Sequence, residues 1–291
     1  MIDRRELMKA AAGAAGLGLF SGSAALAAEA LSEPCARLEA ESGGRLGVGV
    51  LDTASGRTIG HRRDERFPMC STFKVLAAGL VLARVDRNQE SLDRRVSYAK
   101  SDLVTYSPAT EKHVDSGMTI AELCEAAITL SDNTAGNLLL ASFGGPAGLT
   151  TFARSLGDDT TRLDRIETEL NEALPGDPRD TTSPRAMAQD LRALTLGDAL
   201  SPASRAQLIT WLKANTTGGT RLRAGVPPGW TVGDKTGTGD RGTANDVAVL
   251  WPPQRAPLIV TVYLTGATVA RDQQNKMIAD VGAAVVSALG K

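Results

Sequence analysis

The sequence predicts an α/β fold of the α+β kind, with one antiparallel five-stranded sheet, flanking N- and C-terminal helices and an inserted all-α domain. Patterns typical of strands occur toward both ends of the chain, whereas the segment between them has helical patterns. A two-stranded hairpin is only marginally stable alone, so both groups of strands are expected to share one sheet. The expected strands cover residues 45–52, 57–61, 230–238, 245–251 and 258–265.

The first part of this fold is an amphipathic helix followed by a hairpin. Residues 31–42 carry apolar side chains at helical spacing, and Gly43 and Gly44 follow them, as expected where a helix ends. The first two strands flank residues 53–56, a Thr-Ala-Ser-Gly segment whose glycine is typical of a hairpin turn.

The middle of the chain reads as helices joined by loops. The segment 119–129 opens with Thr119 and Glu122, the Thr-x-x-Glu pattern of a capping box. A long stretch rich in Asp, Thr, Pro and Gly follows at 158–183, and a loop of that length inside a compact domain is usually functional. Other helices are expected from residue 73 onward and at 146–156, 184–194 and 272–289.

These patterns divide the chain into two domains. Residues 29–65 and 213–291 are expected to form the α/β domain, and residues 66–212 the helical domain. The helical domain contains an Ω-type loop at about 162–180. A cleft between two domains is a natural place for a small ligand to bind.

The first 28 residues have the composition of an export signal. A basic start containing Arg4 and Arg5 precedes an apolar run, and small residues follow it up to Ala27 and Ala28. The adjacent arginines resemble a twin-arginine signal. The alternative is a short membrane anchor, but the apolar run is too short to span a bilayer. We therefore expect cleavage near Ala27 or Ala28 and a mature protein that is periplasmic or secreted.

The bulk composition is that of an ordinary soluble globular protein. Hydrophobic residues make up 42% of the chain, charged residues 22%, and the formal net charge is −1. Nothing in this balance indicates a nucleic-acid or membrane-surface partner. The only histidines, His61 and His113, form no cluster with the spacing of metal ligands, so no metal site is expected.

Three cysteines cannot all pair with one another, so we expect no intrachain disulfide among Cys35, Cys70 and Cys124. Cys70 lies directly before a serine and could be taken for a nucleophile. A small buried apolar side chain is the simpler interpretation.

Four short motifs carry the chemistry. They are Ser71-x-x-Lys74, Ser131-Asp132-Asn133, Glu167-x-x-Leu-Asn171 and Lys235-Thr236-Gly237. Each is a weak signal alone; a serine cap beside a snorkelling lysine would explain the first one equally well. All four in this order, each at the boundary of an expected element, form a strong signal.

This set of motifs resembles the class A serine β-lactamases. The resemblance covers the whole mature chain and is close to the CTX-M-type enzymes. Further stretches that carry it are Ser101 to Val104, Glu111 to Val114, Arg162 to Arg165 and Pro175 to Ser183. It implies hydrolysis of the β-lactam amide bond of penicillins and cephalosporins, and hence antibiotic resistance, with no cofactor and a β-lactam as the small-molecule partner. Most relatives are monomers, which is the expectation here.

The resemblance assigns the catalytic roles. Ser71 would be the nucleophile that forms an acyl-enzyme. Lys74 and Glu167 are both candidates for the base that activates Ser71, and the choice between them stays open. Glu167 would activate the water that removes the acyl group, and Asn171 would help to hold that water. Ser131 would pass a proton to the leaving β-lactam nitrogen.

The same resemblance implies a set of binding residues. Asn133 would bind the side-chain amide of the substrate, and the backbone N–H groups of Ser71 and Thr238 would form an oxyanion hole. Tyr106 would line the edge of the cleft; its alternative role is core packing.

The carboxylate of a β-lactam needs cations and hydroxyl groups. The resemblance assigns this role to Lys235, Thr236 and Thr238 of the segment that includes Gly237. Many relatives add an arginine near the last helix, where this chain has Asn275. We expect Arg221 to supply the guanidinium instead, with a surface loop charge as the alternative.

The sequence departs from the family pattern after the general base. Many relatives have proline there, and this chain has Thr168. We expect the Glu167–Thr168 peptide to be cis, as in the family, although a cis bond before a residue other than proline costs about 3–4 kcal/mol. Arg165 and Asp180 match the ion pair that joins the ends of the loop.

Two other functions share part of this pattern. A penicillin-binding peptidase has the same nucleophile and Lys-Thr-Gly logic, but it lacks a deacylating glutamate such as Glu167. A binding or sensor domain of the same fold would be acylated once, and it would need a membrane-spanning partner segment. The pair Glu167 and Asn171 favours hydrolysis over both.

Overall fold

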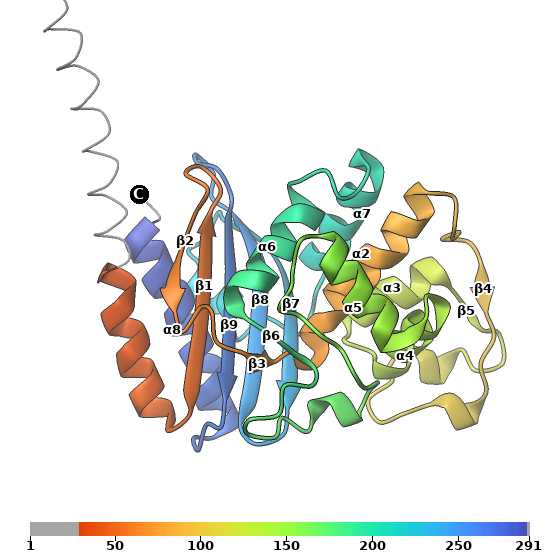
Figure 1. Ribbon diagram of the computed structural model, residues 1–291, viewed down its shortest axis with the longest axis horizontal. Coiled ribbons are helices and arrows are strands. Elements are labelled where there is room, and N and C mark those ends of the chain that lie inside the picture. The colour runs from red at the N-terminus through yellow and green to blue at the C-terminus, as the bar shows by residue number, and fades with distance from the viewer. Residues whose placement is uncertain (1–28, 290–291) are drawn as a thin grey trace, which may run out of the picture.

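The computed structural model describes residues 29–289. Its centre is an antiparallel five-stranded sheet in the order β2-β1-β9-β8-β7 (Figure 1). The strands are β1 (Arg45–Asp52), β2 (Arg57–His61), β7 (Thr231–Gly239), β8 (Thr243–Trp251) and β9 (Leu258–Thr265). The expected sheet is therefore confirmed, because the strands from the two ends of the chain pair directly between β1 and β9.

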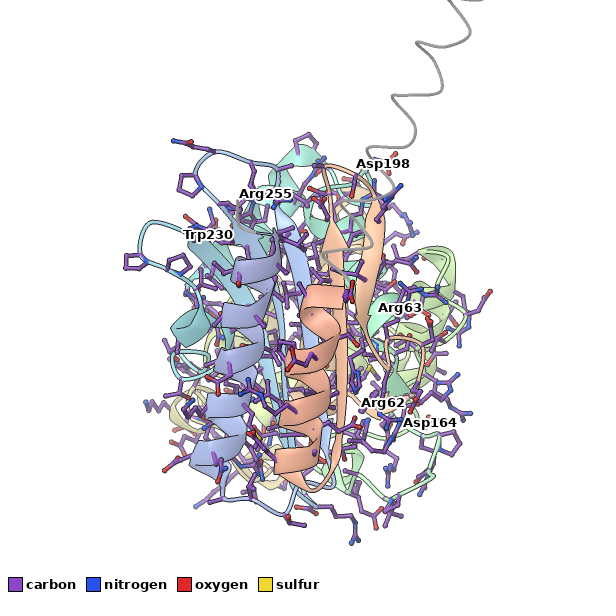
Figure 2. The ribbon with its side chains drawn as sticks, turned by 90° about the vertical axis from the view of Figure 1, so that its left-hand side faces the viewer. Arg62, Arg63, Asp164, Asp198, Trp230 and Arg255 are labelled. Atoms are coloured by element: carbon purple, nitrogen blue, oxygen red, sulfur yellow. The ribbon has the colours of Figure 1, made fainter. Side chains whose placement is uncertain are left out.

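Two helices cover one face of the sheet. They are the N-terminal helix, residues 29–42, and the C-terminal helix α8 (Arg271–Leu289), and Figure 2 shows them side by side. Their apolar faces and one face of the strands form a core that includes Leu31, Leu38, Val281 and Val285. Burial of these side chains is the main reason that the two ends of the chain close together.

The opposite face of the sheet packs against the helical part of the chain. Helix α6 (Pro184–Thr195) contacts β1 and β9, and α2 (Phe73–Asp86) lies at the centre of a second core. Most side chains of α2 are buried, including Lys74, which explains why the segment reads as an unbroken apolar run. The remaining helices of this block are α3 (Ile120–Thr129), α4 (Asn133–Ser142), α5 (Gly145–Ser155) and α7 (Pro202–Lys213).

Several local expectations are confirmed. The hairpin pairs Asp52 with Arg57 at its turn. Thr119 caps α3, with its side chain accepting a hydrogen bond from Glu122 N and the Glu122 carboxylate accepting one from Thr119 N. The division into two domains stays a prediction, since the second core contains residues from both of the proposed parts.

Other features were not expected. The long loop is closed by a two-residue strand pair, β3 (Phe67–Pro68) with β6 (Thr181–Thr182), and β4 (Arg95–Val96) pairs with β5 (Met118–Thr119). Such pairs are too short to leave a period-two pattern in the sequence.

The expected signal segment, residues 1–28, lies outside the described residues. Within residues 29–289, the helices are either too short or too polar to cross a lipid bilayer. The same residues contain no group of three or more His, Cys, Asp or Glu side chains placed to hold a metal ion. Cys35, Cys70 and Cys124 are free thiols, and all of them are buried.

Candidate active site

Ser71 lies in a tight turn rather than in the first turn of the long helix. Cys70–Thr72 form a 3₁₀ turn, and α2 begins at Phe73. Cys70 has a left-handed backbone with φ of 45°, and its thiol is fully buried. A Cβ added to Gly239 would lie 2.6 Å from Cys70 Sγ, so the turn packs tightly against the end of β7. Cys70 is thus a packing residue, as the sequence indicated.

The Ser71 hydroxyl contacts both candidate bases. It donates to Glu167 Oε1 at 2.9 Å and accepts from Lys74 Nζ at 2.9 Å. Lys74 Nζ and Glu167 Oε1 are themselves 3.0 Å apart. Since all three groups are mutually within hydrogen-bonding distance, either base could take the proton of the hydroxyl.

Lys74 is completely buried and is held by two further oxygen atoms. Besides Ser71, its ammonium donates to Ser131 O at 2.9 Å and to Asn133 Oδ1 at 2.7 Å. Burial lowers the pKa of Lys74 below its ordinary value, and the neighbouring Glu167 carboxylate opposes that shift. A lowered pKa makes the neutral amine, which is the form that can accept a proton, easier to reach.

Ser131 is placed between the two buried lysines of the motifs. Lys235 Nζ donates to Ser131 Oγ at 2.9 Å, and Lys74 contacts the carbonyl of the same residue. Burial, together with the charge of Lys74, lowers the pKa of Lys235 well below its ordinary value. A serine with an ammonium on its hydroxyl oxygen is a suitable relay for a proton.

Asp132, the middle residue of Ser-Asp-Asn, acts on the backbone. One of its oxygens caps α4 by accepting from Ala135 N, and the other accepts from the backbone N–H groups of Ala109 and Thr110. These bonds fix the positions of Ser131 and Asn133. The sequence motif names this residue but gives no sign of this structural role.

Glu167 is held from two sides. Its second carboxylate oxygen, Oε2, accepts a hydrogen bond from Asn171 Nδ2, which confirms the expected proximity of the two residues. Its backbone is bracketed by Asn137, whose side chain accepts from Glu167 N and donates to Glu167 O, both at 2.8 Å. The Glu167–Thr168 peptide is cis, as expected. Asn137 was missed because it lies in α4, outside every motif.

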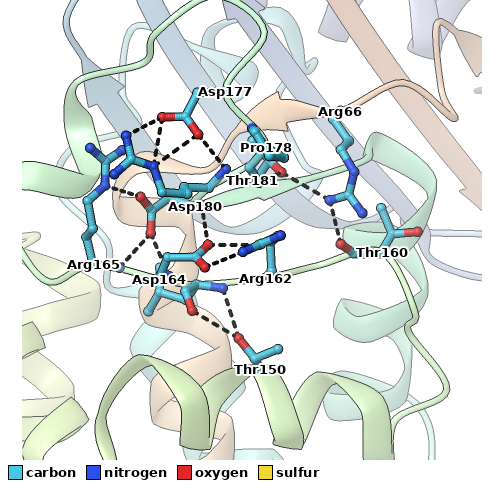
Figure 3. A network of polar contacts seen from close by, with 12 residues as sticks. Arg66, Thr150, Thr160, Arg162, Asp164, Arg165, Asp177, Pro178, Asp180 and Thr181 are labelled. Atoms are coloured by element: carbon cyan, nitrogen blue, oxygen red, sulfur yellow. Dashed lines mark hydrogen bonds and ion pairs between the residues drawn. The ribbon is translucent and has the colours of Figure 1, made fainter.

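The stem of the Ω-type loop is a network of ion pairs (Figure 3). Arg165 Nε contacts Asp180 Oδ2 at 2.6 Å, so the expected pair is confirmed. The other oxygen of Asp180 accepts from the backbone N–H groups of Asp164 and Arg165. Asp180 is only 1% exposed, and it therefore joins the start and the end of the loop from a buried position.

Arg221 reaches the site, but most of its donors serve the protein itself. Its guanidinium donates to Gly237 O and Asn245 O, to Asn275 Oδ1 and, at 2.7 Å, to Thr238 Oγ1. Because the Thr238 oxygen already accepts this bond, its own hydrogen is available for a ligand. The surface-charge alternative is wrong, since Arg221 is only 6% exposed. Because Arg221 contacts the Asn275 side chain, the two positions are neighbours in the fold.

A cavity of about 390 Å³ opens beside Ser131, Asn133 and Thr238. Its rim includes Tyr106, which is 57% exposed, so core packing does not explain that residue. Thr217 also lines it and shares a hydrogen bond with Thr236, a contact that no motif indicated. The lining residues are Tyr106, Ser131, Asn133, Asn171, Thr217, Arg221, Thr236 and Thr238.

Gly237 allows β7 to approach the nucleophile. A Cβ at this position would lie 2.8 Å from Met69 O and 3.1 Å from the Thr72 side chain. Both atoms flank Ser71, so any larger residue would push the strand away from the turn.

The fold and this arrangement of groups define a serine enzyme that works by acyl transfer. The chain belongs to the β-lactamase enzyme family, whose model matches residues 30–289. It is 52% identical to the β-lactamase AST-1 of Nocardia asteroides, over 99% of this chain and 96% of that protein. It is 57% identical to the Escherichia coli β-lactamase CTX-M-97, over 86% of each chain.

Solved structures agree with these relatives. The class A β-lactamase PenP of Rhodopseudomonas palustris is 91% identical in sequence and superposes with a TM-score of 0.89, covering 89% of this chain and all of that one. An ancestral class A β-lactamase is 69% identical, with a TM-score of 0.88 over 89% of this chain and 100% of that chain. The resemblance found in the sequence is therefore confirmed.

Proposed function

We propose that this class A β-lactamase opens the β-lactam amide bond of penicillins and cephalosporins through a Ser71 acyl-enzyme. The observation that carries the proposal is the position of Glu167. One of its oxygens contacts the nucleophile and the other contacts Asn171, so a water held by this pair would lie beside the acyl group. A penicillin-binding peptidase or a sensor domain does not need a pair such as Glu167 and Asn171, because its acyl-enzyme persists.

Acylation begins with proton removal from Ser71 by Lys74 or by Glu167, and the oxygen attacks the lactam carbonyl carbon. The backbone N–H groups of Ser71 and Thr238 stabilise the oxyanion, an effect usually worth a few kcal/mol. The lactam C–N bond then breaks. Ser131 donates a proton to the nitrogen and is reprotonated from the neighbouring lysines.

In deacylation, water is the nucleophile and Ser71 is the leaving group. Glu167 takes a proton from the water, which attacks the ester carbonyl, and Ser71 leaves with a proton returned by the same network. Asn171 orients the water. The product is the ring-opened acid, and the enzyme returns to its starting state.

The substrate carboxylate binds to Lys235 and to the hydroxyl groups of Thr236 and Thr238. Arg221 contributes mainly by fixing the Thr238 oxygen, which turns the hydrogen of that hydroxyl toward the ligand. Asn133 binds the side-chain amide, and Tyr106 forms the edge of the cleft.

The finer points of location and assembly belong to the same proposal. The chain is exported by the twin-arginine route, is cut near Ala27 or Ala28, and acts as a periplasmic or secreted monomer. The paired arginines Arg4 and Arg5 support the route. Replacing both with lysine should leave the precursor uncleaved in a cell fractionation experiment.

Intact-mass spectrometry through time tests the catalytic proposal. Benzylpenicillin is added to the wild type, to Glu167→Ala and to Glu169→Ala, which removes an exposed carboxylate two residues away. The wild type and Glu169→Ala should consume the substrate and return to the free mass. Glu167→Ala should stay acylated on Ser71, with deacylation slower by about 10²–10⁴-fold. A wild type that itself stays acylated would establish the peptidase or sensor function instead.

A further inference from the structure

A pair of buried acidic groups lies outside the active site. Asp158, at the start of the loop that leads to Glu167, is 4% exposed. Asp190, on helix α6, is 1% exposed. Neither takes part in the proposed reaction, and a buried carboxyl group needs an explanation, because burial of an uncompensated charge is costly.

Asp158 has a clear local role. Its Oδ1 atom accepts hydrogen bonds from Thr160 N at 2.6 Å and Thr161 N at 3.0 Å, which closes the turn after α5. Two N–H donors stabilise the ionised form of a carboxyl group. Asp158 is therefore the member of the pair that carries the charge.

Each side chain of the pair has a buried oxygen without a donor. Asp158 Oδ2 and Asp190 Oδ2 are both buried, and among residues 29–289 no donor forms a hydrogen bond with either of them. The two side chains are within hydrogen-bonding distance of each other. Two carboxylates have no donor to share, so this contact is stable only when one proton lies between them.

The charged and titratable groups around the pair provide no alternative donor to these oxygens. From α5, Arg154 donates to the backbone carbonyl oxygens of Asp158 and Thr161, not to a carboxylate. From β9, the Tyr263 hydroxyl contacts Thr72 Oγ1. At the mouth of the neighbouring cavity, Arg185 is paired with Asp64.

The pair connects helix α6 to the stem of the Ω-type loop, the catalytic loop that carries Glu167. Directly after the Asp158 turn, Thr161 Oγ1 and Thr182 Oγ1 are 2.6 Å apart, and Arg162 N donates to Thr181 O at 2.9 Å. The chain then continues to Glu167. Thr182 leads into α6, so the turn, the end of the loop and the helix that carries Asp190 meet at one place.

We propose that Asp190 is a positioning residue for hydrolysis: it shares one proton with Asp158, fixes the stem of the catalytic loop and so holds Glu167 in place. The role of Glu167 rests on the proposed function, but the shared proton does not. Loss of the proton at alkaline pH would place two carboxylates in contact and release the turn at Asp158 from α6.

The direction of the pH effect follows from the site. Burial, with the charge of Asp158, raises the pKa of Asp190 well above its ordinary value, and Arg154 acts in the opposite direction. A raised folded-state pKa stabilises the protein below the ordinary pKa of an aspartic acid. That stability is lost as the pH rises through the raised value.

Infrared difference spectroscopy tests the proton directly. Asp190→Asn keeps the shape of the side chain, and its amide N–H can donate permanently to Asp158. The control, Asp159→Asn, makes the same chemical substitution at the exposed residue next to Asp158. At neutral pH, the carbonyl band of a protonated carboxyl group should disappear in Asp190→Asn and persist in Asp159→Asn. A band that Asp190→Asn leaves unchanged overturns the proposal, as does stabilisation by added Ca²⁺, which would make the pair a cation site.

Hydrogen exchange and deacylation rates then test the positioning role. In a series of increasingly alkaline buffers, the Thr160 and Thr161 amides of the wild type should lose protection relative to those of Asp190→Asn. The ratio of the deacylation rate of Asp190→Asn to that of the wild type should rise several-fold over the same range. Asp159→Asn should follow the wild type. Equal pH profiles for all three proteins would refute the positioning role, even if Glu167→Ala behaves as proposed.

Discussion

At the scale of single residues, the site depends on side chains whose hydrogen-bonding capacity is nearly used up. Lys74 donates three bonds to protein oxygens, and Arg221 donates four. Such groups cannot reorient when a ligand enters, so they present a fixed geometry to the transition state. The exposed Tyr106 at the rim is the contrasting case, since it is free to adapt to the ligand.

Arg221→Ala should weaken both the fold and substrate binding. The change leaves Gly237 O and Asn245 O buried without a donor, so we expect the free energy of unfolding to fall by about 2 kcal/mol. Thr238 also loses its orientation, so KM should rise about tenfold while kcat changes less. Urea unfolding and steady-state kinetics measure the two effects.

The matched control for this change is Arg37→Ala, which removes an exposed arginine from the N-terminal helix. It should leave both quantities nearly unchanged. If Arg221→Ala keeps the KM of the wild type, the hydroxyl of Thr238 does not bind the carboxylate in the way proposed.

At the scale of elements, the catalytic loop, residues 162–180, is held closed by polar contacts at its stem as well as by apolar packing. The stem combines the β3–β6 pair with the ion pairs that Figure 3 shows. Loops with few buried apolar contacts open more readily than a core helix does. The position of Glu167 is therefore only as stable as these polar contacts.

Asp180→Asn should loosen this loop. The amide keeps one acceptor for the Asp164 and Arg165 N–H groups, but it loses the charge that holds the Arg165 guanidinium. Removing one partner of a buried ion pair is expected to cost about 3 kcal/mol or more locally. Deacylation should slow at least tenfold, and protease cleavage within residues 162–180 should become faster.

Asp177→Asn provides the comparison, because Asp177 pairs with Arg179 at the more exposed edge of the same network. Its effect should be within the range of surface pairs, about 0–1 kcal/mol. Equal protease sensitivity of the two variants would show that the buried pair has no special role.

The sequence predicted the elements and the motif residues well, because both depend on local spacing. Thr119 with Glu122 predicts a capping box, and the strand patterns at both ends of the chain predict one shared sheet. It could not predict Asn137, which contacts Glu167 across 30 positions of chain. Nor could it show that Arg221 is mainly engaged with the protein, since that depends on how α8 and β7 meet.

At the scale of the whole molecule, one glutamate adds polar contacts between the N-terminal helix and the sheet to the apolar core that they share. Glu39 accepts two bonds from Arg62, one from Leu46 N and a contact from His61. Burial alone would raise the pKa of Glu39, but its bonds to Arg62, to the Leu46 N–H and to His61 lower it from 4.5 to about 2.

The stability of the protein should therefore decrease in acid by way of Glu39. A lowered folded-state pKa stabilises the fold above the ordinary value, and this contribution is lost as the pH falls from 4.5 through about 2. Glu39→Gln should flatten the acid side of a plot of unfolding midpoint against pH. Glu41→Gln, which alters an exposed residue of the same helix, should keep the wild-type slope; parallel curves for the two variants would contradict the assignment.

The strand order also determines at what stage of synthesis the sheet can form. The middle strand of the sheet, β9, is synthesised after the other four strands of that sheet, and it joins β1 to β8 (Figure 1). A ribosome that has released the chain up to β8 has made every catalytic motif, yet β1 and β8 still lack the strand that lies between them. The five-stranded sheet therefore cannot form until β9 has been made, and a chain truncated before β9 would present the open edges of β1 and β8 to chaperones and proteases rather than a partly active enzyme.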